Sequence, residues 1–351
     1  MKKYLILPIA AMLFAACSND SEIGKAENSA PVPIHLGTSM QVASTRSNDQ
    51  TIQSTELKAG QTVGVYIYFK DANTTNATYS YGYKNIAYTV DVDHTTDATP
   101  GRAGDLLLVT AGDQPYYPEL KTQNVDIYAF SPRTGVYTST GELNTLTAQD
   151  VFATAADQTT EANYIASDFV WGKAANVANG TATAIEIPLE HMLSKININI
   201  APGDGMTLAK LDKAKITLNN VVLQGTVNFT TGAVTPRGGS AGATLTVSSV
   251  DQSTTTTFGT PVKTACTSSA VIIPQTINAS TSFITIQLWD ASANAGAGGY
   301  TSTYNVTTAA NTTFAAKTVY TYNILVNTQG LTLTTTIADW TAGTTTNGTA
   351  E

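Results

Sequence analysis

The sequence predicts an all-β protein made of two β-sandwich domains, and three observations lead to this prediction. Short runs rich in Val, Ile, Tyr and Thr recur along the chain, and Gly, Pro, Asn or Asp separate them. These runs follow one another without the long helical stretches that alternate with strands in βαβ units. The length of 351 residues allows two domains with substantial cores.

Charge limits the classes of partner. Charged residues make up 13% of the chain, and the formal net charge is -8 at pH 7. Because the sequence offers no basic stripe to neutralise phosphate groups, we expect no nucleic-acid partner.

Residues 1–16 have the form of a lipoprotein signal peptide. Two lysines precede an apolar core at 4–14, which is too short to span a bilayer as a mature helix, and LFAAC at 13–17 has the form of a lipobox. We expect cleavage before Cys17 and attachment of acyl chains such as palmitate to this residue, which would hold the precursor on a membrane. The alternative is an ordinary secretory signal that happens to contain a cysteine.

Residues 17–46 combine a polar tether with a predicted strand. The segment 31–46 reads PVPIHLGTSMQVASTR, and its side chains alternate with period two, which is typical of a strand with one buried face. A lone arginine, Arg46, follows the strand and precedes Ser47 in a polar run. On the predicted buried face, Thr38 accompanies five aliphatic residues: Val32, Ile34, Leu36, Met40 and Val42.

Residues 47–188 are predicted to form the first sandwich. The run 114–118 is a Pro-bracketed turn that does not fit a central strand, 143–161 has room for a helical turn or two, and 174–184 is a linker of small residues. Strands are predicted at 61–70, 84–92, 105–110, 125–130 and 167–173.

Residues 189–351 are predicted to form the second sandwich. A long mixed run, 185–200, leads into it, and its second half alternates as a strand with one wet face. Further strands are predicted at 214–222, 226–229, 243–250, 270–274, 283–289, 302–306, 318–326 and 331–340.

The last of these runs differs from the one before it. Residues 319–326 are apolar on both faces, whereas 331–340 alternate, with Leu331, Leu333 and Ile337 on one face. In this the last run is similar to the predicted strand near the N-terminus. Strand exchange needs one edge strand that can be replaced and another that can be supplied to a second copy, and these two runs fit that need. We therefore predict that 331–340 is the donor strand.

Six short motifs resemble the signatures of one family, the fimbrillins or type V pilins. Their order and the lipobox match that family, and the resemblance extends over almost the whole chain. The motifs are DIYAFSP at 126–132, SDFV at 167–170, PLEHMLSK at 188–195, IIPQ at 272–275, KTVYTYNI at 317–324 and IADW at 337–340.

The resemblance implies both a fold and a route of export, proteolytic processing and assembly. It implies two transthyretin-like β-sandwich domains with Greek-key-type connections, exported as a lipoprotein to the outer surface of the outer membrane. A surface protease that cuts after arginine would trim the precursor between Arg46 and Ser47, and the exposed groove would accept a strand from another fimbrial subunit. The alternative for Arg46 is an ordinary solvated residue between strands.

Removal of the predicted N-terminal strand would cost a considerable free energy of burial. Removal of 31–46 would uncover the groove that held five aliphatic side chains, a loss of about 10 kcal/mol at about 1.5–3 kcal/mol for each. A row of backbone donors and acceptors would be uncovered as well. Insertion of a strand from the next copy, head to tail, would restore both and build a filament.

Residues able to carry chemistry are scattered. His35, His94 and His191 form no metal-binding spacing, and we expect His191 to be packed or hydrogen-bonded. The acidic run 91–97 lacks the Gly and Glu of an EF-hand loop. Cys266 is the one cysteine of the mature body, and we expect it to be buried or half-buried. The sequence therefore predicts no enzyme, no metal site and no cofactor.

Two functions of different classes are open at this point. The favoured one is a structural subunit of a surface fimbria that supports adhesion. The alternative is a monomeric surface lipoprotein that binds carbohydrate or another ligand. In it, aromatic side chains would stack on sugar rings: Trp171, Trp289, Trp340, Tyr116 and Tyr117.

Overall fold

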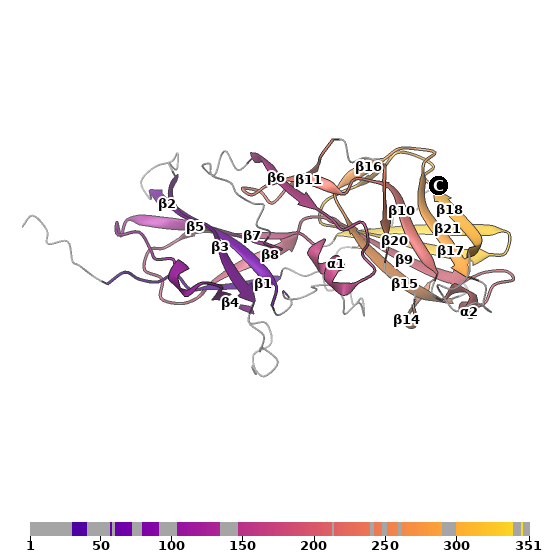
Figure 1. Ribbon diagram of the computed structural model, residues 1–351, viewed down its shortest axis with the longest axis horizontal. Helices are drawn as coiled ribbons and strands as arrows, with labels where there is room; N and C mark the ends of the chain where they lie inside the picture. The colour runs from indigo at the N-terminus through magenta and orange to yellow at the C-terminus, as the bar shows by residue number, and fades with distance from the viewer. Residues whose placement is uncertain are drawn as a thin grey trace, which may run out of the picture. The chain divides into compact units, whose positions relative to one another are not determined.

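The computed structural model in Figure 1 is built almost entirely of β-strands in its described part. The described residues from Val32 onward belong to one compact unit. The structure describes residues 30–40, 57, 60–71, 79–90, 104–133, 147–212, 214–238, 242–247, 251–258, 262–289, 300–339 and 345–346.

Seven strands of the first half form a closed ring in the order β1-β4-β3-β2-β5-β7-β8. Side chains from different strands of this ring share one core, in which Val65, Ile127 and Leu189 are fully buried. The strands are β1 (Leu36–Met40), β2 (Thr62–Asp71), β3 (Tyr79–Val90), β4 (Gly104–Leu108), β5 (Gln123–Ser131), β7 (Val170–Val177) and β8 (Ile185–His191).

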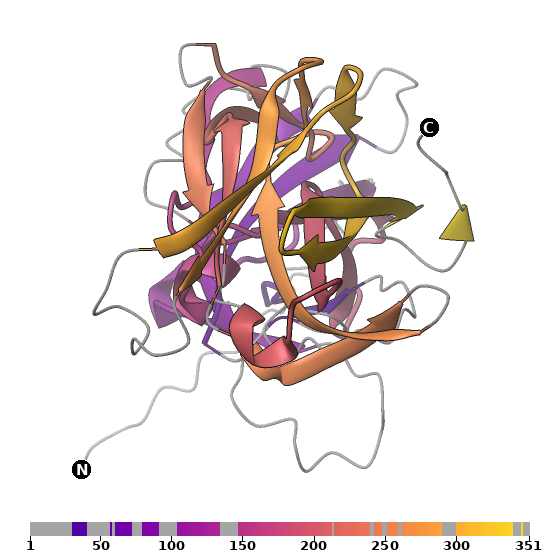
Figure 2. The ribbon, with the colours of Figure 1, turned by 90° about the vertical axis from the view of Figure 1, so that its right-hand side faces the viewer.

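Two sheets of the second half share another core. One has the order β13-β10-β17-β18 and the other the order β14-β15-β9-β20-β21-β22. Figure 2 views the molecule from the end where strands of the second half lie, drawn in orange and yellow. Ile198 of β9, Ile216 of β10 and Ile284 of β17 are fully buried between them. The strands are β9 (Ser194–Pro202), β10 (Lys215–Val221), β13 (Ala243–Thr246), β14 (Asp251–Phe258), β15 (Lys263–Ile272), β17 (Ser282–Trp289), β18 (Tyr300–Thr307), β20 (Thr318–Asn327), β21 (Gly330–Asp339) and β22 (Thr345–Thr346).

A third, aromatic core joins elements from both halves of the sequence. Phe130 of β5 and Phe169 pack against Phe229, with ring centroids 4.7 Å and 6.5 Å away. Beside them, β6 pairs with β11 in a small sheet of order β12-β11-β6. The remaining elements are β6 (Thr147–Ala153), β11 (Gln224–Asn228), β12 (Val234–Pro236), β16 (Gln275–Ile277), β19 (Thr312–Phe314), the 3-10 helix η2 (Ala111–Asp113), α1 (Glu161–Ala166) and α2 (Leu208–Leu211).

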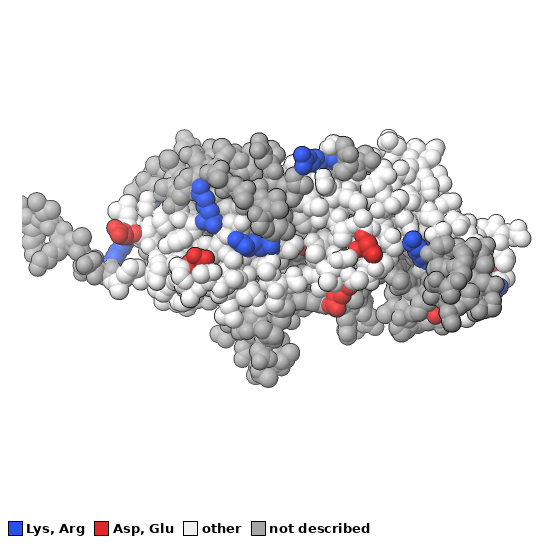
Figure 3. All heavy atoms as spheres, in the orientation of Figure 1, with Lys and Arg blue, Asp and Glu red and all other residues white. Residues whose placement is uncertain are grey.

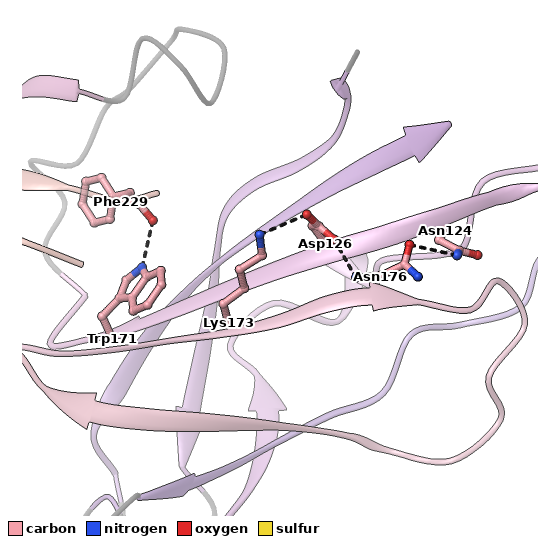
Figure 4. Close-up of polar contacts among 6 residues, drawn as sticks. All are labelled: Asn124, Asp126, Trp171, Lys173, Asn176 and Phe229. Carbon is pink, nitrogen blue, oxygen red and sulfur yellow. Dashed lines mark hydrogen bonds and ion pairs between the residues drawn. The ribbon is translucent and has the colours of Figure 1, made fainter. Parts of the chain in front are cut away.

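Charged groups are sparse on the face shown in Figure 3, where Lys and Arg are scattered among uncharged residues. The carboxylate of Asp126 is buried and paired: Lys173 Nζ lies 3.1 Å from Asp126 Oδ2, and the Asp126 side chain is 2% exposed (Figure 4). The backbone N–H of Asn176 donates to the same carboxylate at 2.6 Å. On the same strand, Trp171 Nε1 donates to the Phe229 carbonyl at 2.8 Å.

Gly172 shows why β7 and β8 approach as closely as they do. A Cβ atom at this position would lie 2.1 Å from the carbonyl oxygen of Pro188 on β8. Because no side chain fits in that distance, only glycine permits this pairing.

The all-β class predicted from the sequence is confirmed. Within 143–161, predicted to have room for a helical turn, the chain instead forms β6, and the short helix α1 begins at Glu161. The predicted small-residue linker 174–184 begins inside β7. The division into domains at 47–188 and 189–351 stays a prediction.

Candidate functional site

The strand predicted near the N-terminus is present as β1, and it closes the ring between β4 and β8 (Figure 1). It runs antiparallel to β4 over two residue pairs and parallel to β8 over five, from Leu36 beside Ile185 to Met40 beside Leu189. β7 pairs with β8 only from Leu189 to His191. In the described part of the chain, the first half of β8 therefore has β1 as its only strand neighbour.

Alternate side chains of this segment enter the core, as the period of two predicts. Ile34 is 1% exposed, Leu36 is 4% exposed and Thr38 is 2% exposed, whereas His35 is exposed. Thr38 Oγ1 is buried and has no hydrogen-bond partner in the described structure. Val32 departs from the expected burial, with 37% of its surface exposed.

The residues ahead of β1 are held by the Pro-bracketed turn. The N–H of Ile34 donates to the carbonyl of Pro115 at 2.9 Å, and the N–H of Tyr117 donates to the carbonyl of Val32 at 3.0 Å. Gln114 Nε2 donates to the carbonyl of Ile34 at 3.1 Å. The N-terminal segment is thus held in two places. β1 pairs with strands of the ring, and the residues ahead of it are hydrogen-bonded to the turn at 114–118.

A cavity of about 450 Å³ lies where β1 and β4 separate. Its lining includes residues 34–36 and 106–108, together with Tyr88 and Gln114. Among its described lining residues none is Asp, Glu, Lys or Arg. Burial raises the pKa of the Tyr88 phenol, and Tyr83 nearby raises it further. β1 thus pairs with β4 over only two residue pairs, and the cavity lies beside this short pairing.

The predicted donor strand is present as β21, which pairs antiparallel with β20 along its whole length. Leu331 is partly buried against the core of the C-terminal sheets. Leu333 and Ile337 are 40% and 38% exposed, although they share a face with buried residues of β20. β21 therefore carries apolar side chains that its own sheet covers incompletely.

Four of the predicted site residues lie outside the described part of the chain: Cys17, Val42, Arg46 and Ser47. The backbone of Met40 is described as part of β1, and its side chain is not. The lipidation site and the cleavage site therefore stay predictions.

The histidine prediction is confirmed for His191, which is buried with its Nδ1 2.9 Å from Asp168 Oδ1. Cys266 is buried, as expected. The described residues contain no group of three or more His, Cys, Asp or Glu side chains arranged to hold a metal ion. In that same part of the chain, no helix is long and apolar enough to cross a membrane.

One part of the site, the role of Gln114, could not be identified in advance, whereas the burial of Thr38 was predicted. Gln114 belongs to a turn that the two prolines mark in the sequence, but its bond to Ile34 joins positions 80 residues apart. Thr38 shares the parity of the buried residues, and that parity was the available signal for its burial.

Comparison with known proteins adds the family. The sequence pattern described as fimbrillin-like matches residues 45–340. No protein of curated function matches the chain. A Bacteroides ovatus structure, described as a cell adhesion protein, covers 90% of this chain and 100% of its own, with TM-score 0.60 and 19% identity.

A second similar structure is a protein from Bacteroides uniformis, also described as a cell adhesion protein. It covers 88% of this chain and 98% of its own, with TM-score 0.56 and 17% identity. At these identities the two structures show a shared fold. The family assignment rests on the sequence match, which spans most of the chain, and the protein therefore belongs to the fimbrillin-like family.

Proposed function

We propose that this protein is a structural subunit of a surface fimbria, assembled by exchange of β1 for a strand of another copy. The family is one of structural fimbrial and adhesion proteins, which supports a role as a subunit. The observation that carries the exchange is the position of β1, the N-terminal strand that closes the ring between β4 and β8.

The geometry of β1 suits a strand that is first present and later replaced. It is the first strand of the described chain, so a cut in the sequence after it separates it from everything else in the ring. Its loss would leave residues 185–188 of β8 without a strand neighbour among the described elements. Unpaired strand edges of this kind favour the addition of a strand from another chain.

The burial lost with β1 can be worked out for two side chains. Ile34 and Leu36 are almost fully buried, and at about 1.5–3 kcal/mol each their exposure costs about 3–6 kcal/mol. This sum covers two of the five aliphatic residues expected to be buried, because Val32 is exposed and the side chains of Met40 and Val42 lie outside the described residues. The uncovered backbone of β8 adds to it. A partner strand would recover these terms.

We propose further that the precursor is exported as a lipoprotein to the cell surface, with acyl chains on Cys17, and that an arginine-specific protease trims it after Arg46. The form of residues 1–17 supports the lipid anchor. The place of Arg46, shortly after β1 in the sequence, supports the cut. Trimming would release both the anchor and the strand that fills the ring.

The test is the variant Arg46→Ala, with Arg237→Ala as the matched control because Arg237 is an exposed arginine outside the ring. Both variants and the parent are treated with an arginine-specific protease, and heat-resistant ladders are scored on a gel. We expect ladders from the parent and from Arg237→Ala, and folded, membrane-bound monomer from Arg46→Ala. Ladders from Arg46→Ala would contradict the role of Arg46. A parent that stays monomeric after verified cleavage would favour a monomeric ligand-binding protein instead.

A further inference from the structure

β21 lies near the edge of its sheet, and most of its outer side has no strand neighbour in the described structure. β20 pairs with its inner side along the whole strand. On the outer side, β22 pairs only with Ile337 and Ala338. Residues 330–336 therefore form an open sheet edge among the described elements.

The hairpin that β20 and β21 form fixes which backbone groups point outward. Asn327 and Gly330 flank its two-residue turn, and the pair that closes such a turn is hydrogen-bonded. Hydrogen-bonded pairs alternate with non-hydrogen-bonded pairs along an antiparallel ladder, so every second residue from Gly330 bonds to β20. The backbone N–H and C=O groups of Leu331, Leu333 and Thr335 therefore point away from β20, toward the open side.

This edge lacks the features that prevent a sheet edge from pairing with another chain, which include charges, prolines, irregular pairing, short length and a covering segment. Residues 330–336 contain no charged residue and no proline, and the pairing of β21 with β20 has no break in register. Other edges of the described structure each have one of these features. Pro236 ends β12, β16 and β19 are three residues long, and the pairings of β6, β14 and β18 have breaks in register. Residues 156–158 cover β13 through hydrogen bonds to Thr246.

The open edge of β21 is complementary to a second copy of itself. If two such strands pair antiparallel with Leu333 opposite its own copy, Leu331 lies opposite Thr335, and all three outward-pointing residues are paired. Moving the centre by one residue would place Leu331 opposite Ile337, where β22 lies, or Thr335 opposite Gln329 in the turn. The centred register also brings together the two Leu333 side chains, each 40% exposed in its own sheet.

We propose that two copies of the uncut protein pair through their β21 edges, antiparallel and centred on Leu333, to form a two-fold dimer with one continuous sheet. Contact between identical edges closes on itself, so it builds a dimer and no filament. Each copy has a net charge of -8, but no charged residue lies within 330–336, so the edges meet without like charges opposite each other. The pairing leaves β1 in the ring and β21 in its own sheet, and it is independent of the proposed strand exchange.

Disulfides on the outer face of the joined sheet measure the register. Thr332 of one copy would lie opposite Thr334 of the other in a non-hydrogen-bonded pair, with Cα atoms about 4.5 Å apart. A disulfide spans Cα distances of about 4.4–6.8 Å, so this pair is within reach. The same residue of the two copies would lie on a diagonal of about 7–8 Å, beyond that reach. Both threonines are exposed, so cysteines there leave the core unchanged.

Protein carrying Thr332→Cys is incubated with protein carrying Thr334→Cys, without protease, and oxidised mildly. We expect a covalent dimer on a non-reducing gel at a yield at least ten-fold above that of either variant alone. The parent protein, oxidised alongside, measures any contribution of Cys17, and the native Cys266 is fully buried. A covalent dimer from either variant alone would overturn the register centred on Leu333.

Leu333→Lys, added to both cysteine variants, tests the edge itself, because a lysine on an edge strand opposes pairing. Thr303→Lys is the matched control, since it adds the same charge at an exposed position of β18. We expect Leu333→Lys to lower the dimer yield at least ten-fold and Thr303→Lys to leave it unchanged, with similar melting temperatures for both. Absence of the dimer from the mixture, or a yield that Leu333→Lys does not lower, would overturn pairing through β21. Because no protease is used, these results do not depend on whether trimmed protein polymerises.

Discussion

Substitutions in β1 should destabilise the precursor according to how deeply each side chain is buried. In precursor held uncut by Arg46→Ala, we expect Ile34→Ala and Leu36→Ala each to lower the free energy of unfolding by about 2–5 kcal/mol. The basis is their burial, with 1% and 4% of their surfaces exposed. Val32→Ala is the control: at 37% exposure we expect a change within about 0.5 kcal/mol.

Urea unfolding followed by tryptophan fluorescence measures these differences, because Trp171 belongs to β7 of the same ring. At an m-value of about 2 kcal/mol per M urea, a loss of 2 kcal/mol lowers the midpoint by about 1 M. Equal midpoints for all three variants would refute the packing of β1 in the ring. The same two substitutions should have no effect on assembled polymer, from which residues 1–46 have been removed.

Two other substitutions test the ring itself. Gly172→Ala should prevent β7 and β8 from pairing, because its Cβ would lie 2.1 Å from the Pro188 carbonyl oxygen. The control Gly112→Ala, with nothing within 4 Å of its Cβ, should be tolerated. The melting temperature of the two variants distinguishes them, and similar values would contradict the close approach of β7 and β8. Burial raises the pKa of Tyr88 above its ordinary value of 10.0, so the unfolded chain ionises first and stability should fall as the pH rises above 10. Tyr88→Phe should reduce that fall, measured as urea midpoints at about pH 7 and about pH 11, and an unchanged alkaline fall would count against the buried phenol.

The alternation of side chains was enough to predict the strands at both ends of the chain. Period two assigns Ile34 and Leu36 to one face, and both are buried. It cannot say where the neighbouring strands end, which is why Val32 was expected to be buried and is exposed. Burial parity is a local property of sequence, whereas the extent of a core depends on elements far along the chain.

The pairing of β1 with β4 and β8 could not be predicted. Its hydrogen bonds join backbone groups, and every residue type except proline offers the same donor and acceptor. Its parallel partner, β8, begins at Ile185, far along the chain. For the same reason the turn at 114–118 was recognised from its prolines, but its bonds to Ile34 and Val32 were not. The pairing of β6 with β11 also crosses a boundary that composition had placed between two domains.

The central claim is that the place of β1 is filled by this strand before assembly and by a partner strand afterwards. Amide hydrogen exchange at residues 185–187 of β8 tests it most directly, because β1 is their only strand neighbour in the described structure. We predict slow exchange in the uncut precursor, fast exchange in trimmed monomer separated from residues 1–46, and slow exchange again in polymer. Fast exchange in polymer, or equally slow exchange in all three samples, would contradict strand replacement at this site.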